Sequence, residues 1–546
     1  MSRLDRFFGR IFAWCEKNPV FVIVIFFAVT LAIRYSLAFL AWRFLHFPFQ
    51  RYDPYMYTVK GMEIAVGDWS PIRTHGLGWS AVLGAVFRVW HGSSILENLA
   101  IASFVAAVFS ALSFFPLMYI GKKVDGNPRT LALLAVLFLS SFFLTVPEND
   151  SIAMADPLFV FLFLVSVCFL YSARTRLAMA FACGAVAAIA YFTKPVGIFT
   201  VPLACATFFL WHCRQWGDAL RKCALFVSSF ALVSAPFLWQ RHAYFGSFFD
   251  YGENSKYFAD TYAGAWGEAV SAPSFLGYMG THGMLDYANK FLIGGVCFVA
   301  AAFLAMTAPY ILSWVKNAAH GAEKGTGAAY PLFVGCAVWF VGLIPVFHIY
   351  GNPRHLLPAV ALSLVLAATG FRRFADATRL KNVAYAGISL FAALFLFLSF
   401  ASLVFFSKDK KVAMRDGAVW ARHLAPLLKG NVAIGNGSDI LMMQYPDSRV
   451  GGKGMLDMYA PQSGVAVRYP GMFSAVEAFR PWLKTGDIDY VVFDDVVKES
   501  FPFAPDKYLS IYTGTDFPPY LVPFYSNYES NSQWKVRVFS VNKDLL

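Results

Sequence analysis

The sequence predicts a polytopic α-helical membrane protein with about eleven transmembrane helices and a small C-terminal α/β domain outside the membrane. Hydrophobic residues make up 58% of the 546-residue chain and charged residues only 14%, whereas a soluble protein carries about 25% charged residues. Apolar runs long enough to cross a bilayer recur from Pro19 to about residue 406. Beyond residue 407 the pattern changes to short β-type runs between turn residues.

The net charge of the chain is +12. In a membrane protein an excess of lysine and arginine gathers in cytoplasmic loops, so this charge does not require nucleic acid as a partner. The eight cysteines follow no metal-ligand spacing, and none lies after residue 400. We therefore expect them to be small buried side chains and not a disulfide framework.

The first apolar run follows a basic N-terminal segment that carries Arg3, Arg6, Arg10 and Lys17. The run is too long for the core of a signal peptide and lacks a clear cleavage site, so we expect a retained signal anchor. Apolar runs and their charged boundaries predict spans at about 20–46, 98–120, 129–147, 156–172, 177–193, 196–213, 222–242, 291–315, 330–350, 355–371 and 383–406.

Four short basic loops set the expected orientation. They lie at 122–129, 174–176, 214–222 and 372–381. All four fall on the side of the N-terminus if the short apolar segment 78–90 does not cross the membrane. Because basic loops belong to the cytoplasm, we expect 78–90 to be re-entrant or to lie on the surface, with the N-terminus inside and the C-terminus outside.

This orientation divides the chain into a membrane part, residues 1–407, and an outer domain, residues 408–546. The outer face would also gather a first loop at 48–97, a second loop at 148–156 and a long loop at 243–290. The β-type runs that predict an α/β outer domain stand at 432–435, 489–494 and 536–539.

The outer face collects ionisable side chains that an inert scaffold would not need. The acids are Asp53, Glu63, Asp68, Glu148, Asp150 and Asp156, and the bases are His75, Lys194, Arg241, His242, Arg354 and His355. A carboxylate can take the proton of an attacking hydroxyl, and cations can neutralise a departing phosphate. The set therefore suits group transfer from a phosphate leaving group, and a lipid-borne donor would explain its place at the membrane surface.

Five motifs follow one another between residues 50 and 370. They are Asp53-Pro54-Tyr55-Met56-Tyr57 with Gly67-Asp68-Trp69, Thr74-His75-Gly76-Leu77-Gly78, Asp156-Pro157-Leu158-Phe159, Thr193-Lys194-Pro195-Val196-Gly197, and Asn352-Pro353-Arg354-His355-Leu356-Leu357-Pro358. In order and spacing they resemble the GT-C superfamily of polytopic glycosyltransferases, nearest the bacterial branch of protein O-mannosyltransferases and aminoarabinose transferases. Two departures are that the second motif lacks the family's two prolines and that His355 replaces its usual tyrosine.

The resemblance implies a GT-C-like membrane part that takes a sugar from a polyprenyl-phosphate donor. The first-loop acid of the family is the catalytic one, which makes Asp53 the expected base. Candidates for a second acid are Asp156, Glu148 and Asp150. Candidates for binding the donor phosphate are Arg354, Lys194, Arg241 and His75. A single displacement would invert the anomeric centre.

Each assignment has a structural alternative. Asp53 and Asp156 both precede a proline, where a residue often caps a helix. Arg354 and Lys194 could be interfacial side chains that extend to water. The aromatic side chains that could form a platform for the sugar are Tyr55, Tyr57, Trp69 and Tyr257, although such residues more often form an interfacial belt.

We expect no firm cofactor, although Asp53 with Glu148 or Asp150 is a candidate site for a divalent ion. The expected partners are a polyprenyl-phosphate sugar donor, a glycan, lipid or protein acceptor, and the bilayer, but no nucleic acid. The lack of a cleaved signal and a cysteine-free outer domain favour the inner membrane of a bacterium, with the domain in the periplasm.

Other functions stay open at this point. A lipid-linked sugar transporter or flippase would explain the many spans, but it would also need polar groups at mid-depth. A non-catalytic membrane assembly subunit would use the outer domain to bind a partner. A phosphoryl-group transferase is a further alternative within the enzymes.

Overall fold

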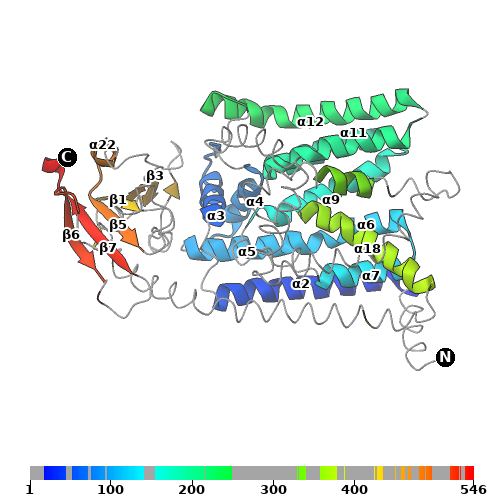
Figure 1. Cartoon of the computed structure of the whole chain (residues 1–546), viewed down its shortest axis with the longest axis horizontal. Coiled ribbons are helices and arrows are strands. Elements are labelled where there is room, and N and C mark those ends of the chain that lie inside the picture. The colour runs from blue at the N-terminus through cyan, green and yellow to red at the C-terminus, as the bar shows by residue number, and fades with distance from the viewer. Residues whose placement is uncertain are drawn as a thin grey trace, which may run out of the picture.

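The computed structural model forms a helix bundle with a β-sheet at one end (Figure 1). The structure describes residues 17–44, 52–71, 76–92, 95–140, 154–213, 215–248, 331–339, 357–377, 427–428, 430–434, 449–450, 457–460, 465–468, 479–485, 487–494, 517–527 and 535–546, and the single residues 329, 387, 424 and 529.

The long helices lie side by side along the bundle (Figure 1). They are α2 (Pro19–Phe44), α5 (Ile95–Leu112), α6 (Phe114–Val124), α7 (Pro128–Ser140), α9 (Asp156–Ala173), α10 (Leu177–Thr193), α11 (Thr200–Trp211), α12 (Trp216–Phe245) and α18 (Leu357–Ala377). A short 3-10 helix, η1 (Pro195–Phe199), joins α10 to α11. These helices coincide with the apolar runs of the sequence because a buried or lipid-facing backbone must satisfy its hydrogen bonds internally.

Four of the described helical segments are long and apolar enough to cross a membrane: Glu97–Val124, Asp156–Ala173, Trp216–Phe245 and Leu357–Asp376. Three expected spans have other boundaries in the structure. The span expected at 355–371 continues to Ala377. The span expected at 222–242 begins at Trp216 and continues to Phe245, where Gly246 takes φ 73° and ends the helix. The span expected at 196–213 begins as a 3-10 helix because Pro195 and the extended Lys194 interrupt the chain. The spans expected at 291–315 and 383–406 lie outside the described residues.

The core of the bundle lies between α6, α7, α9, α10, α11 and α18. The fully buried Trp339, in the helical segment 331–339, contributes a large part of it. Its ring centroid lies 4.8 Å from that of Phe163 and 5.8 Å from that of Phe199. Aromatic side chains thus join three parts of the chain that are far apart in sequence, and burial of such rings stabilises the packing.

Two shorter helices, α3 (Tyr52–Ala65) and α4 (Gly78–Val89), lie across the end of the bundle that faces the sheet (Figure 1). The segment 78–90 was expected not to cross, and α4, with 12 residues, would be about 18 Å long, too short for a hydrocarbon core of about 30 Å. No helix was expected between residues 48 and 77. The helix α3 forms there because its apolar side chains find partners on α4, α5 and the ends of other helices.

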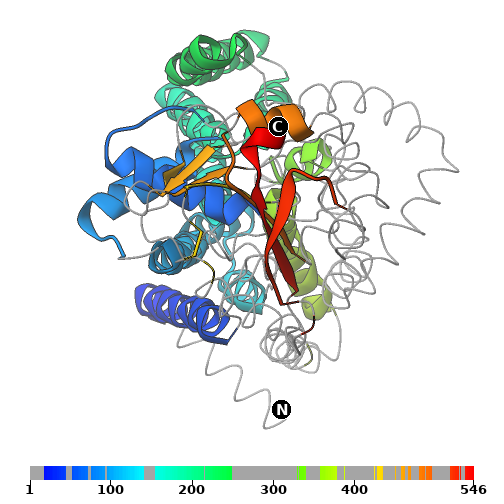
Figure 2. The same cartoon turned by 90° about the vertical axis from the view of Figure 1, so that its left-hand side faces the viewer.

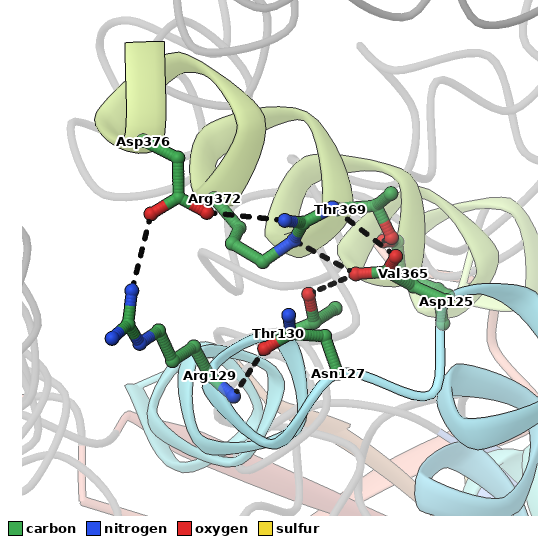
Figure 3. Close-up of polar contacts among 8 residues, drawn as sticks. All are labelled: Asp125, Asn127, Arg129, Thr130, Val365, Thr369, Arg372 and Asp376. Atoms are coloured by element: carbon green, nitrogen blue, oxygen red, sulfur yellow. Dashed lines mark hydrogen bonds and ion pairs between the residues drawn. The ribbon is translucent and has the colours of Figure 1, made fainter. Parts of the chain in front are cut away.

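The opposite end of the bundle carries the basic loops. Asp125, which follows α6, accepts hydrogen bonds from Nε and NH2 of Arg372 at 3.0 and 3.2 Å. Asp376 accepts from NH1 of Arg372 at 3.1 Å and from NH1 of Arg129 at 3.3 Å (Figure 3). We call Asp125, Arg129, Arg372 and Asp376 the α6–α18 charge cluster.

A second contact brings two more of the basic loops to the same end. Lys222 Nζ, near the start of α12, donates a hydrogen bond of 2.8 Å to the carbonyl of Arg174, which follows α9. The loops whose charges predicted one common side of the membrane therefore meet at one end of the bundle, away from the sheet.

The C-terminal sheet has seven described strands in the order β2-β3-β4-β1-β5-β7-β6. Figure 2 shows the molecule from the end that carries this sheet. The strands are β1 (Gly430–Ile434), β2 (Arg449–Val450), β3 (Asp457–Ala460), β4 (Val465–Arg468), β5 (Tyr490–Asp494), β6 (Leu521–Ser526) and β7 (Val536–Val541), with a short helix α22 (Phe479–Thr485). Among the described strands, the parallel pairs are those of β1 with β4 and with β5. The three expected β-type runs became β1, β5 and β7, and the other four strands had not been expected.

Candidate functional site

A buried ion pair lies at the end of the bundle that faces the sheet. Lys194 Nζ donates a hydrogen bond to Oδ1 of Asp156. Both side chains are buried. The second carboxylate oxygen, Oδ2 of Asp156, is buried without a hydrogen-bond partner among the described residues. Burying a charged pair costs free energy unless its geometry and hydrogen bonds compensate, so this arrangement is a candidate for function.

The helix ends that carry the pair follow from local sequence. Asp156 is the first residue of α9, and Pro157 occupies the first turn, where a missing backbone N–H costs nothing. Lys194 follows the last residue of α10 and is extended, with φ −150° and ψ 125°, because it precedes Pro195. As α9 and α10 are consecutive and run in opposite directions, these two ends meet.

The helix that carries Asp53 belongs to the apolar clusters at the same end of the bundle. One turn after Asp53, Met56 belongs to an apolar cluster with Phe237 of α12, against which Phe192 of α10 packs. The next residue, Tyr57, belongs to a second cluster with Ala155 and Leu158 at the start of α9. The residues after Asp53 therefore share apolar clusters with the helix ends that carry Asp156 and Lys194. The side chain of Asp53 lies outside the described residues.

Two glycines let the chain between α3 and α4 approach the pair closely. A Cβ on Gly76 would overlap the carbonyl oxygen of Phe192, and a Cβ on Gly78 would overlap Oγ1 of Thr193. Only glycine fits so close to the backbone that precedes Lys194. The motif that carries His75 therefore packs on the motif that carries Lys194, whereas His75 itself lies outside the described residues.

Arg241 lies near the end of α12, at the same end of the bundle. Its side chain is fully buried. Its Cζ lies 5.7 Å from the ring centroid of Phe237 and 5.4 Å from that of Phe245. Aromatic faces attract a guanidinium group and help to hold it away from water. A second buried cation thus lies close to α3.

The structure adds Lys60, which was not among the candidates. Its Nζ lies 2.6 Å from Oε2 of Glu63, 2.6 Å from Oγ of Ser70 and 3.6 Å from Oδ2 of Asp68. Burial raises the pKa of Glu63 to about 7, and the neighbouring Lys60 opposes that rise. A lysine three residues before a glutamate on a helix is the signal that would have found this pair.

The expected aromatic platform does not come together among the described residues. Tyr57 is buried in an apolar cluster, and its carbonyl accepts a hydrogen bond from Ser80. Trp69 is exposed. The remaining candidate side chains lie outside the described residues: Tyr55, Glu148, Asp150, Tyr257 and Arg354. Within the described residues no three His, Cys, Asp or Glu side chains are arranged to hold a metal ion, and two of the carboxylates expected near Asp53 are not among them.

No protein-family model and no curated protein matches the chain. Solved structures do match. ArnT from Cupriavidus metallidurans, bound to undecaprenyl phosphate, aligns over 96% of this chain and 98% of its own, with 15% identity and a TM-score of 0.58. An oligosaccharyltransferase from Archaeoglobus fulgidus, tethered with an acceptor peptide, aligns over 96% of this chain and 74% of its own, with 14% identity and a TM-score of 0.50.

At such low identity these alignments establish the fold, and they do so along nearly the whole chain. Both proteins are polytopic glycosyltransferases of one superfamily. The chain therefore shares its fold with ArnT and with this oligosaccharyltransferase, two members of the superfamily that its five motifs resemble.

Proposed function

We propose that this protein is an integral membrane glycosyltransferase that moves a sugar from a polyprenyl-phosphate donor to a hydroxyl group of a glycan, lipid or protein. The observation that carries the proposal is the buried Asp156–Lys194 pair, with one carboxylate oxygen unpaired among the described residues. The pair lies at helix ends that share an apolar cluster with the helix that carries Asp53. The GT-C fold and the lipid phosphate bound to ArnT support it.

In the proposed reaction, Asp53 accepts the proton of the acceptor hydroxyl as its oxygen attacks the anomeric carbon. The bond from that carbon to the phosphate oxygen breaks, and the polyprenyl phosphate leaves with the electron pair. One displacement inverts the anomeric centre. Asp156 acts as the second acid of the site, with Glu148 and Asp150 as the other candidates for that role.

The ion pair refines the roles of the cations. Because Lys194 already binds Asp156, the two together carry no net charge. Lys194 therefore orients Asp156. It contributes to binding of the phosphate only while it is paired with that carboxylate, so it adds little net positive charge. Most of the positive charge that stabilises the departing phosphate then comes from Arg241 and Arg354, with His75 as a further ligand. Trp69, Tyr55 and Tyr257 remain the candidates for contacts with the sugar.

The proposed orientation places the N-terminus and the basic loops in the cytoplasm and the C-terminal sheet in the periplasm, in the inner membrane of a bacterium. The grouping of basic loops at the end of the bundle opposite the sheet supports it. A divalent ion between Asp53 and Glu148 or Asp150 remains a proposal as well. Chelation during the assay tests it, and activity that survives chelation would contradict it.

The deciding experiment measures which lipid donor is consumed and which product receives the label. Purified protein in liposomes is incubated with labelled polyprenyl-phosphate sugars and membrane extract, and both the consumed lipid and the labelled product are identified. Asp53→Asn should abolish transfer while the protein still inserts. Asp218→Asn is the matched control, because Asp218 is exposed near the start of α12, at the opposite end of the bundle. Full activity of Asp53→Asn would end the assignment of the base, and lipid that crosses the bilayer without a covalent product would favour a flippase.

A further inference from the structure

Four large apolar side chains are exposed where α3 and α4 end. The exposed fractions are 65% for Val66, 47% for Trp69, 89% for Val89 and 59% for Trp90. Val66 and Trp69 follow the last residue of α3, while Val89 and Trp90 end α4. We call these four residues the α3–α4 tip. The ion pair involves none of them, and of the four only Trp69 is a candidate for contact with the sugar.

The two helices bring these side chains to one place. Near Gly61 of α3 and Gly84 of α4 the helices approach closely, since a Cβ on Gly61 would lie 2.7 Å from Cβ of Leu83, and a Cβ on Gly84 would lie 2.8 Å from Cβ of Ile64. One turn further on, Arg88 Nε donates a hydrogen bond of 3.2 Å to the carbonyl of Ala65. The helices therefore run in the same direction, and their C-terminal ends lie together.

The tip is joined to an exposed apolar surface of α12. The backbone carbonyl of Trp69 accepts a hydrogen bond of 2.6 Å from Nε2 of Gln240, near the end of α12. α12 is long and apolar enough to span a membrane. Only 28% of the 18-residue stretch in which it is most apolar is buried inside the protein. Its side chains Leu232 and Trp239 are 66% and 69% exposed. An apolar helix face of this kind contacts acyl chains, and Trp239 lies towards the end of the helix, where tryptophan prefers the membrane interface.

From this placement we infer that the α3–α4 tip is an interfacial anchor, which inserts Val66, Trp69, Val89 and Trp90 into the leaflet on the side of the sheet, at the boundary between headgroups and acyl chains. A contiguous exposed apolar patch marks an interaction surface. Continuity with α12 makes lipid the occupant. Arg88 and His91, both exposed beside the tip, suit contact with lipid headgroups.

The anchor would set the depth of α3. Because α3 and α4 lie across the bundle (Figure 1), a tip held in the headgroup layer keeps the whole of α3 at that level. If the proposed function is correct, this is the level at which the phosphate of a lipid-linked donor lies. The anchor itself does not depend on the proposed function, and the test below measures no transfer.

Spin labels test the depth of the tip directly. Single cysteines at Val66 and Val89 are labelled in a full-length variant without the eight native cysteines, and the protein is placed in liposomes. Accessibility to oxygen, relative to a water-soluble nickel complex, should be roughly threefold or more higher at both positions than at Val522. Val522 is the matched control, because it is an apolar residue that is 43% exposed on the edge strand β6. Leu232 is the lipid-facing reference.

Equal accessibility at Val66, Val89 and Val522 would overturn the anchor. Broadening of the spectra that disappears on dilution with unlabelled protein would overturn it as well, because it would show a second copy at the tip. A second measurement, tryptophan quenching in the protein that keeps its native cysteines, guards against misfolding of the cysteine-free variant. Lipids brominated near the headgroup should quench the fluorescence of the unmodified protein more strongly than that of the Trp69→Phe, Trp90→Phe variant, and equal quenching would contradict the inference.

Discussion

At the scale of the residue, Asp156 and Lys194 form a buried ion pair in which the two charges compensate each other. Removing one partner of a buried ion pair leaves an uncompensated charge and costs about 3–5 kcal/mol, whereas replacing both with apolar side chains is often neutral. We therefore expect Lys194→Met to lower the stability of the protein by that amount, and Asp156→Leu with Lys194→Met to restore most of it. Thermal unfolding in detergent measures both.

The same variants separate structure from function. If the pair serves transfer, the stable double variant should still be inactive in the lipid assay. A double variant that regains both stability and transfer would show that the pair is structural.

Asp156 and Lys194 are each 19 residues from Thr175, in the turn between α9 and α10. This symmetry about the turn is the sequence signal that would have predicted their contact.

Glu63 predicts a pH dependence of the first outer loop. Its pKa of about 7 lies above the ordinary value of 4.5, chiefly because of burial. An acid with a raised pKa contributes stability below its ordinary pKa and loses it as the pH rises through the raised value. The segment 52–71 should thus lose up to about 3 kcal/mol of local stability between pH 4.5 and pH 8. Hydrogen exchange measures it, and Glu63→Gln should remove most of the slope.

An unchanged slope in Glu63→Gln would show that another group titrates. Peptides from α12 in the same protein provide the internal reference, since they report changes in the whole fold. Lys60 should remain bound to Asp68 and Ser70 in this variant, because its Nζ contacts both.

At the scale of the element, the docking of α4 on the end of α10 depends on Gly76 and Gly78. Added methyl groups there would collide with the backbone of Phe192 and the side chain of Thr193. Overpacking of this kind costs about 1–3 kcal/mol. We expect Gly76→Ala and Gly78→Ala to lower the unfolding temperature and to reduce transfer, because they displace the segment next to Lys194.

Gly217→Ala is the control for these variants. A Cβ on Gly217, at the start of α12, would meet no atom within 4 Å, and alanine favours a helix over glycine by about 1 kcal/mol. Stability should therefore stay the same or rise. If Gly76→Ala behaved like Gly217→Ala, the close approach of the two motifs would not matter for the fold.

At the scale of the whole molecule, the α6–α18 charge cluster joins segments about 250 residues apart at the end away from the sheet (Figure 3). Asp125→Asn and Arg372→Met should each lower stability, and the double variant should cost less than the sum of the two. The coupling should be roughly 1–2 kcal/mol, as for residues that share one hydrogen-bonded network. Thermal unfolding of the four proteins in this cycle measures it.

Arg176→Met is the control for the cycle, because Arg176 is an exposed arginine at the same end of the bundle and outside the cluster. Its replacement should change stability little, as for most exposed charges. Additive effects of Asp125→Asn and Arg372→Met would show that their bidentate contact contributes nothing to the fold.

The sequence by itself determined the class of the protein, the positions of most described helices and the common side of the basic loops. Hydropathy and charge act locally, through the cost of moving each segment or side chain into lipid, and can be read residue by residue. The motifs also identified Asp156 and Lys194 one at a time.

Only the tertiary structure decided that Asp156 binds Lys194, that Lys60 binds Glu63 and Asp68, and that α3 is a helix lying across the bundle. Each of these depends on packing between segments, which a linear pattern does not specify. The segment that became α3 is too short and too polar to be read as a span, and it is helical because α4 and α5, together with the ends of other helices, cover its buried side chains.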